Sequence, residues 1–82
     1  MECTEEAFVA LLRESFDAPA QETLPVLTGE TELETLQGWD SLTRLALTVA
    51  LEEEFGVMLE HENFSECRTV RELMDKAMEL AP

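Results

Sequence analysis

The stretch LQGWDSLTRLALTVALEEEFG, residues 36–56, carries a long apolar pattern at helical spacing. Asp40 is a strong N-cap candidate, because its side chain accepts a hydrogen bond from a free N–H of the first turn. Gly56 suits the left-handed position just past a helix end. These signals predict a helix that begins near Asp40 or Ser41 and ends at Gly56.

Apolar side chains cover more than one stripe of this predicted helix. Either the helix is buried on several sides, or part of its apolar surface is kept for another task. One side carries Leu42, Leu45, Ala46, Val49 and Ala50, and the pattern extends round the cylinder through Leu47, Leu51 and Phe55. If Leu51 and Phe55 are fully buried, replacing either by alanine is expected to destabilise the fold by about 2–5 kcal/mol.

Two further helices are predicted on either side of this stretch. The first runs from about Thr4 to Phe16, with Thr4 as its N-cap and Phe8, Leu11, Leu12 and Phe16 on its buried face. The last runs from about Val70 to Leu80, where Thr69 and Glu72 form a capping box and the core face is Val70, Leu73, Met74, Ala77 and Leu80.

The remaining segments are less regular. Residues 17–37 read as a long loop, pinned to the core by Leu24, Val26, Leu27, Leu33 and Leu36. Thr31 with Glu34 indicates a short helical turn within it. Another short turn is expected at residues 61–66, with Phe64 pointing inward. No segment alternates with period two, so the predicted fold is all-α: a bundle of three main helices and one short helix.

Length and charge limit the functions that the chain can have. Its 82 residues predict one small domain, residues 1–82, and its net charge is −14. Such an acidic chain is a poor match for nucleic acid or for an anionic membrane. Basic protein surfaces are the expected partners, and solubility alone is an equal alternative explanation for the acids.

The cysteines and the N-terminal residues indicate the cellular compartment of the protein. Cys3 and Cys67 are too widely spaced for a disulfide framework or a metal site and are expected to be reduced thiols. No signal peptide and no membrane-spanning stretch is visible, so a cytoplasmic protein is expected. Cys67 reads as an apolar filler before the last helix, with a reactive thiol beside Arg68 as the alternative.

Enzyme constellations are not visible in the sequence. Ser41 has no identifiable base of the kind that a nucleophilic serine needs, and GWDSL is not the glycine-flanked turn of a hydrolase. His61 is expected to be solvated. Glu52, Glu53 and Glu54 are consecutive and lack the spacing of a calcium loop. We therefore expect no catalytic and no metal-binding residues. Ser41 instead lies where a helix start stabilises a phosphate, which makes it a candidate attachment point for a phosphate-linked group.

The stretches GWDSL, ALEEEFGV and TVRELMDKA together resemble the acyl carrier protein family. The family pattern Gly-x-Asp-Ser-Leu is met by Gly38, Asp40, Ser41 and Leu42. The resemblance implies a four-helix bundle in which a phosphopantetheinyl transferase attaches 4′-phosphopantetheine to Ser41. It further implies that Asp40 is recognised by that transferase and that the arm carries an acyl or aminoacyl group as a thioester.

The resemblance also implies a surface for partner enzymes. Loading and downstream enzymes are expected to contact Leu42, Leu45, Ala46, Val49, Glu52 and Glu53 of a monomeric carrier. Trp39, Arg44 and Glu60 depart from carriers of fatty acid synthesis. These departures favour a specialised pathway, such as polyketide or nonribosomal peptide synthesis. The competing hypothesis is an unmodified acidic helical module that binds a basic partner and in which Ser41 has no functional role.

Overall fold

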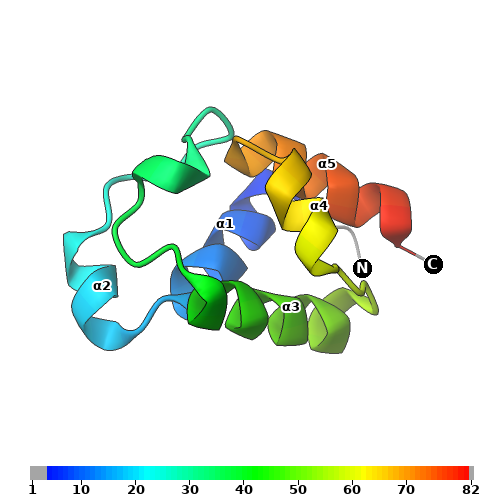
Figure 1. Cartoon of the computed structure of the whole chain (residues 1–82), viewed down its shortest axis with the longest axis horizontal. Helices are drawn as coiled ribbons and strands as arrows, with labels where there is room; N and C mark the ends of the chain where they lie inside the picture. Colours follow the sequence, from blue (N-terminus) through cyan, green and yellow to red (C-terminus); the bar gives the residue numbers. More distant parts are fainter. Residues whose placement is uncertain (1–3, 82) are drawn as a thin grey trace.

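The structure is a computed structural model and describes residues 4–81; Cys3 lies outside the described residues. Within that range the chain forms five α-helices, one 3₁₀ helix and no strand (Figure 1). The elements are α1 (Glu5–Ser15), α2 (Ala18–Thr23), η1 (Leu33–Thr35), α3 (Ser41–Phe55), α4 (His61–Glu66) and α5 (Val70–Leu80). The expectation of an all-α bundle is confirmed.

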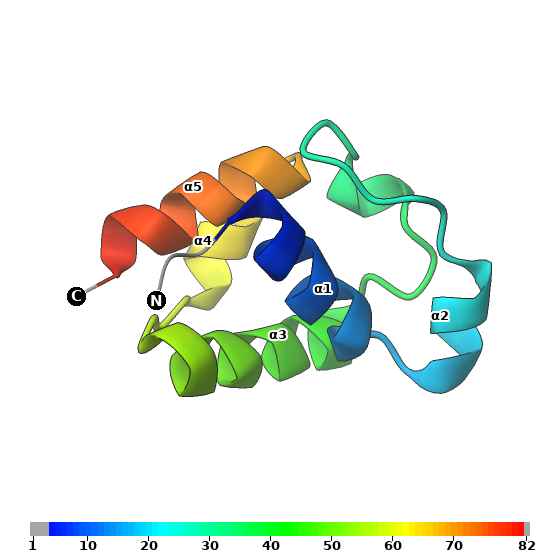
Figure 2. The same ribbon diagram turned by 180° about the vertical axis from the view of Figure 1, so that it is seen from behind.

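The three long helices enclose one apolar core. Helix α1 packs against both α3 and α5, and α4 packs against α5. Figures 1 and 2 show α3 and α5 on opposite sides of the bundle, with α1 and α4 between them. The buried side chains of these helices and of the segments that connect them form one cluster, which includes Phe8, Leu12, Phe16, Leu33, Leu47, Leu51, Val57, Phe64, Val70, Leu73 and Ala77.

Side-chain caps start the long helices as the sequence predicts. Thr4 Oγ1 accepts from the N–H of Ala7 at 3.1 Å, and Asp40 Oδ1 accepts from the N–H of Thr43 at 3.0 Å. Each bond satisfies a first-turn donor that has no partner inside its helix. Gly56 ends α3 with a φ of 70°, the left-handed conformation that glycine adopts without steric cost.

The predicted loop of residues 17–37 contains a helix, α2, that was not predicted. Asp17 caps α2 by accepting from the N–H of Ala20 at 3.0 Å, and Pro19 stands in the first turn, where its missing N–H costs nothing. Leu27, Leu33 and Leu36 are buried and pin the connection as expected, with Leu24 partly buried. The same prediction was wrong for Val26, which is 84% exposed.

The capping box predicted at Thr31 and Glu34 does not form. The turn starts at Leu33, and Thr31 Oγ1 accepts instead from the N–H of Thr28 at 2.9 Å. The backbone of the next residue, Glu32, pairs with Thr69 in an isolated antiparallel bridge. This bridge ties the connection to the start of α5.

The other predicted capping box, at Thr69 and Glu72, is half correct. Thr69 Oγ1 accepts from the N–H of Glu72 at 3.2 Å, as expected. The Glu72 carboxylate, however, accepts from the N–H of Arg68 at 3.0 Å rather than from that of Thr69. The glutamate therefore bonds to the N–H of the residue before the N-cap and not to that of the N-cap itself.

Four helical positions are less buried than predicted, among them Met74, which is only partly buried. Leu80 is 44% exposed because it lies in the last turn of α5, beyond the elements that cover the core. Leu11 and Phe55 are only partly buried at the edge of the cluster. The loss expected for a fully buried Phe55 therefore does not apply to it. In the part of the chain described, no helix is both long enough and apolar enough to cross a membrane.

Candidate functional site at the start of helix α3

A rigid turn delivers the chain to Ser41, the first residue of α3. Gly38 has a φ of 94°, and a Cβ built there would lie 3.1 Å from Cβ of Ala20 and 3.3 Å from Cδ2 of Phe16. The carbonyl of Gly38 accepts from the buried Thr43 hydroxyl at 2.7 Å. The positive φ favours glycine at this turn, and a Cβ there would also press on Ala20 and Phe16.

Asp40 caps α3 and presents an ionised carboxylate beside Ser41. The backbone N–H of Thr43, followed by smaller contributions that include the charge of Arg44, holds the pKa of this exposed carboxyl below its usual value. The hydrogen bond that caps the helix stabilises the charged form of the carboxyl, so the same bond lowers its pKa.

The hydroxyl of Ser41 differs from those of the other serines. Ser15 and Ser65 lie within helices, and their hydroxyls donate to carbonyls one turn earlier, those of Leu11 at 2.9 Å and His61 at 3.4 Å. Ser41 is exposed, and its hydroxyl makes no hydrogen bond to residues 4–81. This hydroxyl is thus free to react at a helix start, where first-turn N–H groups and the helix dipole favour a phosphate.

A groove of about 230 Å³ opens directly beside Ser41, between α3 and α4. Most of its walls are side chains with apolar surface. The lining residues are Ser41, Arg44, Leu45 and Thr48 from α3, with Leu59, His61 and Phe64 opposite. His61 is exposed, as expected, but it also forms part of the groove wall.

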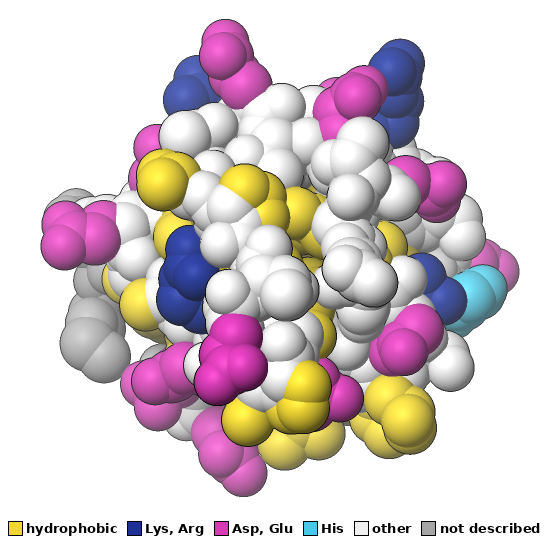
Figure 3. Space-filling view, turned by 90° about the vertical axis from the view of Figure 1, so that its left-hand side faces the viewer, with side chains coloured by type: hydrophobic (Ala, Val, Ile, Leu, Met, Phe, Trp, Pro, Cys, Tyr) yellow, Lys and Arg dark blue, Asp and Glu magenta, His cyan; other side chains and the backbone are white. Residues whose placement is uncertain are grey.

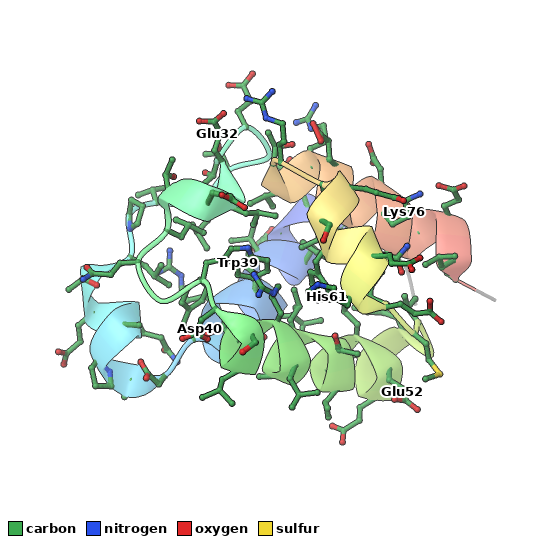
Figure 4. All side chains as sticks on the ribbon, in the orientation of Figure 1. Glu32, Trp39, Asp40, Glu52, His61 and Lys76 are labelled. Atoms are coloured by element: carbon green, nitrogen blue, oxygen red, sulfur yellow. The ribbon has the colours of Figure 1, made fainter. Side chains whose placement is uncertain are left out.

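Trp39 joins the turn to the bundle. Its ring lies 6.2 Å from that of Phe16 and 5.9 Å from that of Phe64, centroid to centroid, the second pair edge to face. The Arg44 guanidinium carbon lies 5.9 Å from the same indole centroid. Figure 4 shows Trp39 and His61 together between α3 and α4. Trp39 thus packs between Phe16 at the end of α1 and Phe64 of α4, and neither these contacts nor the one with Arg44 was predicted.

An apolar strip, consisting of Leu42, Leu45, Ala46 and Val49, lies on the outer face of α3. Leu42 is 76% and Leu45 60% exposed, whereas Leu47 and Leu51 on the inner face are fully buried. In Figure 3 apolar side chains gather along the lower edge of the molecule, at the height of α3, with acids around them. Glu52 and Glu53 are exposed at the far end of the helix. Of the two alternatives that the sequence left open for this helix, the structure shows the second: part of its apolar surface stays exposed.

The remaining candidates show no reactive arrangement. Cys67 is buried, and that burial, reinforced by Glu72, raises the pKa of its thiol, which matches an apolar filler and not a thiolate. Among the residues described, no group of three or more histidine, cysteine, aspartate or glutamate side chains is placed to hold a metal ion.

Comparison with known proteins agrees with this geometry. Residues 6–76 match the family described as "Phosphopantetheine attachment site". The chain is 43% identical over 49 residues to "Acyl carrier protein 2, chloroplastic" from Spinacia oleracea, an alignment that covers 60% of this chain and 37% of that relative's length. No solved structure gives a significant match. The family match indicates a covalently attached 4′-phosphopantetheine. The chain belongs to the acyl carrier protein family of phosphopantetheine-binding proteins.

Proposed function

We propose that this chain is a carrier that holds an acyl or aminoacyl group on a 4′-phosphopantetheine arm attached to Ser41. The observation that carries the proposal is the exposed, unbonded hydroxyl of Ser41 at the first residue of α3, beside the groove. We further propose that residues 1–82 act as one monomeric cytoplasmic carrier domain that catalyses no reaction alone.

The residues at this site fit the group. In the transferase complex the Ser41 hydroxyl attacks the coenzyme A phosphorus that bears pantetheine. The Oγ–P bond forms as the pyrophosphate P–O bond breaks, the adenosine bisphosphate departs, and the hydroxyl proton passes to a base of the transferase. The Asp40 carboxylate stays ionised beside this oxygen and offers the transferase a recognition group. Once attached, the arm supplies a terminal thiol that carries the cargo as a thioester.

The outer face of α3 suits docking of a partner enzyme close to Ser41. The apolar strip begins at Leu42, the residue after Ser41, and ends three residues before Glu52. A partner that covers the strip and places basic side chains against Glu52 and Glu53 would face the arm directly. Phosphopantetheinyl transferases and acyl-handling enzymes are the partner classes that this arrangement supports.

The cargo pathway is proposed to be specialised rather than housekeeping fatty acid synthesis. Arg44 brings a cation next to Ser41, and Trp39 supplies a large aromatic surface at the same point. Both change the chemistry that a partner meets at the attachment site. We favour polyketide, nonribosomal peptide or related acyl transfer on these two residues.

Intact-protein mass spectrometry tests the attachment. The protein is incubated with coenzyme A, Mg²⁺ and a broad-specificity phosphopantetheinyl transferase. Wild type and Ser65→Ala, a matched control at another helical serine, should gain the mass of one phosphopantetheine, and Ser41→Ala should gain none. Modification of Ser41→Ala to the wild-type extent would refute the proposal.

A second function, an unmodified module that binds a basic partner, is favoured by the exposure of the apolar strip. It predicts that apo protein binds its partner tightly and that Ser41→Ala leaves the affinity unchanged. A partner that binds only the phosphopantetheinylated protein would exclude this second function.

A further inference from the structure

Arg44 differs from the other basic residues of this chain. Arg68 pairs with Glu32 at 3.0 Å and Arg71 with Glu5 at 3.1 Å, while Lys76 lies near two glutamates. The Arg13 guanidinium donates to the carbonyl of Pro25 at 3.1 Å. In residues 4–81, Arg44 alone of the five has no ion pair and no side-chain hydrogen bond. On a chain of net charge −14, a cation without an ion-pair partner is unexpected.

The position of Arg44 places this cation beside the attachment site. It stands three residues after Ser41 on α3, and residues at that spacing are neighbours on a helix surface, about 5–6 Å apart between Cβ atoms. Both residues line the same groove. The guanidinium is therefore within reach of a group bonded to Ser41 Oγ.

Trp39 limits where the guanidinium can go. Its indole lies against Phe16, Phe64 and the Arg44 guanidinium, and the last contact has the geometry of a cation–π interaction. Because the ring packs on two core phenylalanines, its contact with Arg44 lies on the side of α3 that faces α4, where Trp39 and Arg44 line one cavity with His61 and Phe64. Arg44 also lines the groove beside Ser41.

We propose that Arg44 binds the phosphate carried on Ser41 and thereby directs the arm into the groove between α3 and α4. This inference rests on the proposed function, since it requires a phosphate at Ser41. A guanidinium presents paired N–H donors that match phosphate oxygens, and the first turn of α3 adds backbone donors on the same oxygen set. Arg44 is a positioning residue in this scheme and touches no reacting atom.

Two acids near Arg44 compete for the same cation. Glu34 lines a smaller cavity of about 100 Å³ together with Arg44, Trp39 and His61, and the charge of Arg44 acts on Asp40. Neither carboxylate is at ion-pair distance from the guanidinium. A phosphate bonded directly to Ser41 Oγ is held near the Arg44 guanidinium by its covalent attachment. Its high effective concentration there favours it over the two carboxylates. A carboxylate on the cargo lacks this advantage, because the whole arm separates it from Ser41.

A phosphoserine at position 41 tests the inference without a transferase. The second ionisation of this phosphate is followed by ³¹P NMR in the full chain, in an otherwise wild-type background, in Arg44→Gln and in Arg68→Gln. Arg68 is the matched control, because it is an exposed arginine whose ion pair lies on the connection to α5. Circular dichroism verifies that all three proteins are folded.

Arg44→Gln is expected to raise the second pKa of the phosphoserine by roughly 0.2–0.7, the range that corresponds to an exposed ion pair. Arg68→Gln should change it by less than a third as much. High salt should remove most of the difference, because the contact is partly exposed. Equal titration of the two variants would overturn the inference, and so would an Arg44 effect that salt does not reduce.

The phosphopantetheinylated protein supplies the second measurement. The ³¹P resonance of the phosphodiester should shift on Arg44→Gln and stay unchanged on Arg68→Gln, whichever cargo is loaded. A resonance that responds to Arg44→Gln only when the cargo carries a carboxylate would reassign Arg44 to the cargo and overturn the phosphate contact. If wild type accepts no pantetheine while the phosphoserine titration depends on Arg44, the proposed function fails and the phosphate contact stands.

Discussion

Replacing Leu51 by alanine should be among the most damaging changes to α3, and the matched change at Leu45 should be nearly silent. Leu51 is fully buried in the cluster between α3 and α1, whereas Leu45 is 60% exposed on the outer face of the same helix. Both changes replace leucine by alanine within one helix, so helix propensity cancels in the comparison. The difference between them measures burial alone.

The structure sets the size of this difference. A buried leucine truncated to alanine loses its transfer free energy and leaves a cavity, together about 2–5 kcal/mol. A domain of 82 residues has a total stability of roughly 4–12 kcal/mol, so the variant keeps a folded population under most of this range. The melting temperature should fall by about 8–40 °C, at roughly 4–8 °C per kcal/mol for a chain of this size. Leu45→Ala should change stability by about 0.5 kcal/mol or less.

Urea denaturation followed by circular dichroism provides the assay. Leu51→Ala should shift the midpoint strongly at an unchanged slope, and Leu45→Ala should leave it close to wild type. Comparable losses for the two variants would show that α3 is rotated relative to the arrangement described. A larger loss at Leu45 would refute the assignment of its outer face.

Three further predictions concern the turn, the cap and the net charge. Gly38→Ala should lower the free energy of unfolding, measured by urea denaturation, by about 1–2 kcal/mol, because alanine at a φ of 94° is strained and its Cβ would press on Ala20. An unchanged free energy would mean that the turn adopts another conformation. The pKa of Asp40 is lowered in the folded state, so its charge stabilises the fold above the unfolded pKa and this contribution disappears as the pH falls below about 4. Asp40→Asn should therefore show a smaller drop in melting temperature on acidification than wild type, and parallel pH curves would contradict the cap. Added salt should raise the melting temperature, because it screens the repulsion of a chain of net charge −14, and a salt-independent value would show that this repulsion is already offset.

The helices that matter most for the site follow local rules and could be predicted. Thr4, Asp40 and Thr69 each form the cap that their sequence position indicates, and Gly56 ends α3 in the expected conformation. Helix α2 was missed because six residues with a proline resemble a loop, although Asp17 followed by Pro19 is a helix-start signal. The short turn expected after Thr31 does form, as η1, but its capping box does not, since the backbone at Glu32 pairs with Thr69, which is distant in the sequence.

Some residues of the site could likewise be predicted from local sequence patterns, and others could not. Ser41, Asp40 and the apolar strip could be placed from spacing along one helix. The groove could not, because it exists only where Leu59, His61 and Phe64 are folded against α3. The contact of Arg44 with Trp39 also escapes sequence patterns, since one residue lies in the turn and the other in the helix. Arg44 stood out in the sequence only as an unusual charge near Ser41.

Peptide-level mass spectrometry of the protein after exposure to a phosphopantetheinyl transferase and coenzyme A tests the central claim most directly. The proposed function predicts that the whole added mass lies on Ser41, with the peptides that contain Ser15 and Ser65 unmodified and a free thiol at the end of the added group. Attachment at any other residue, or an unmodified Ser41 with several transferases, would contradict it.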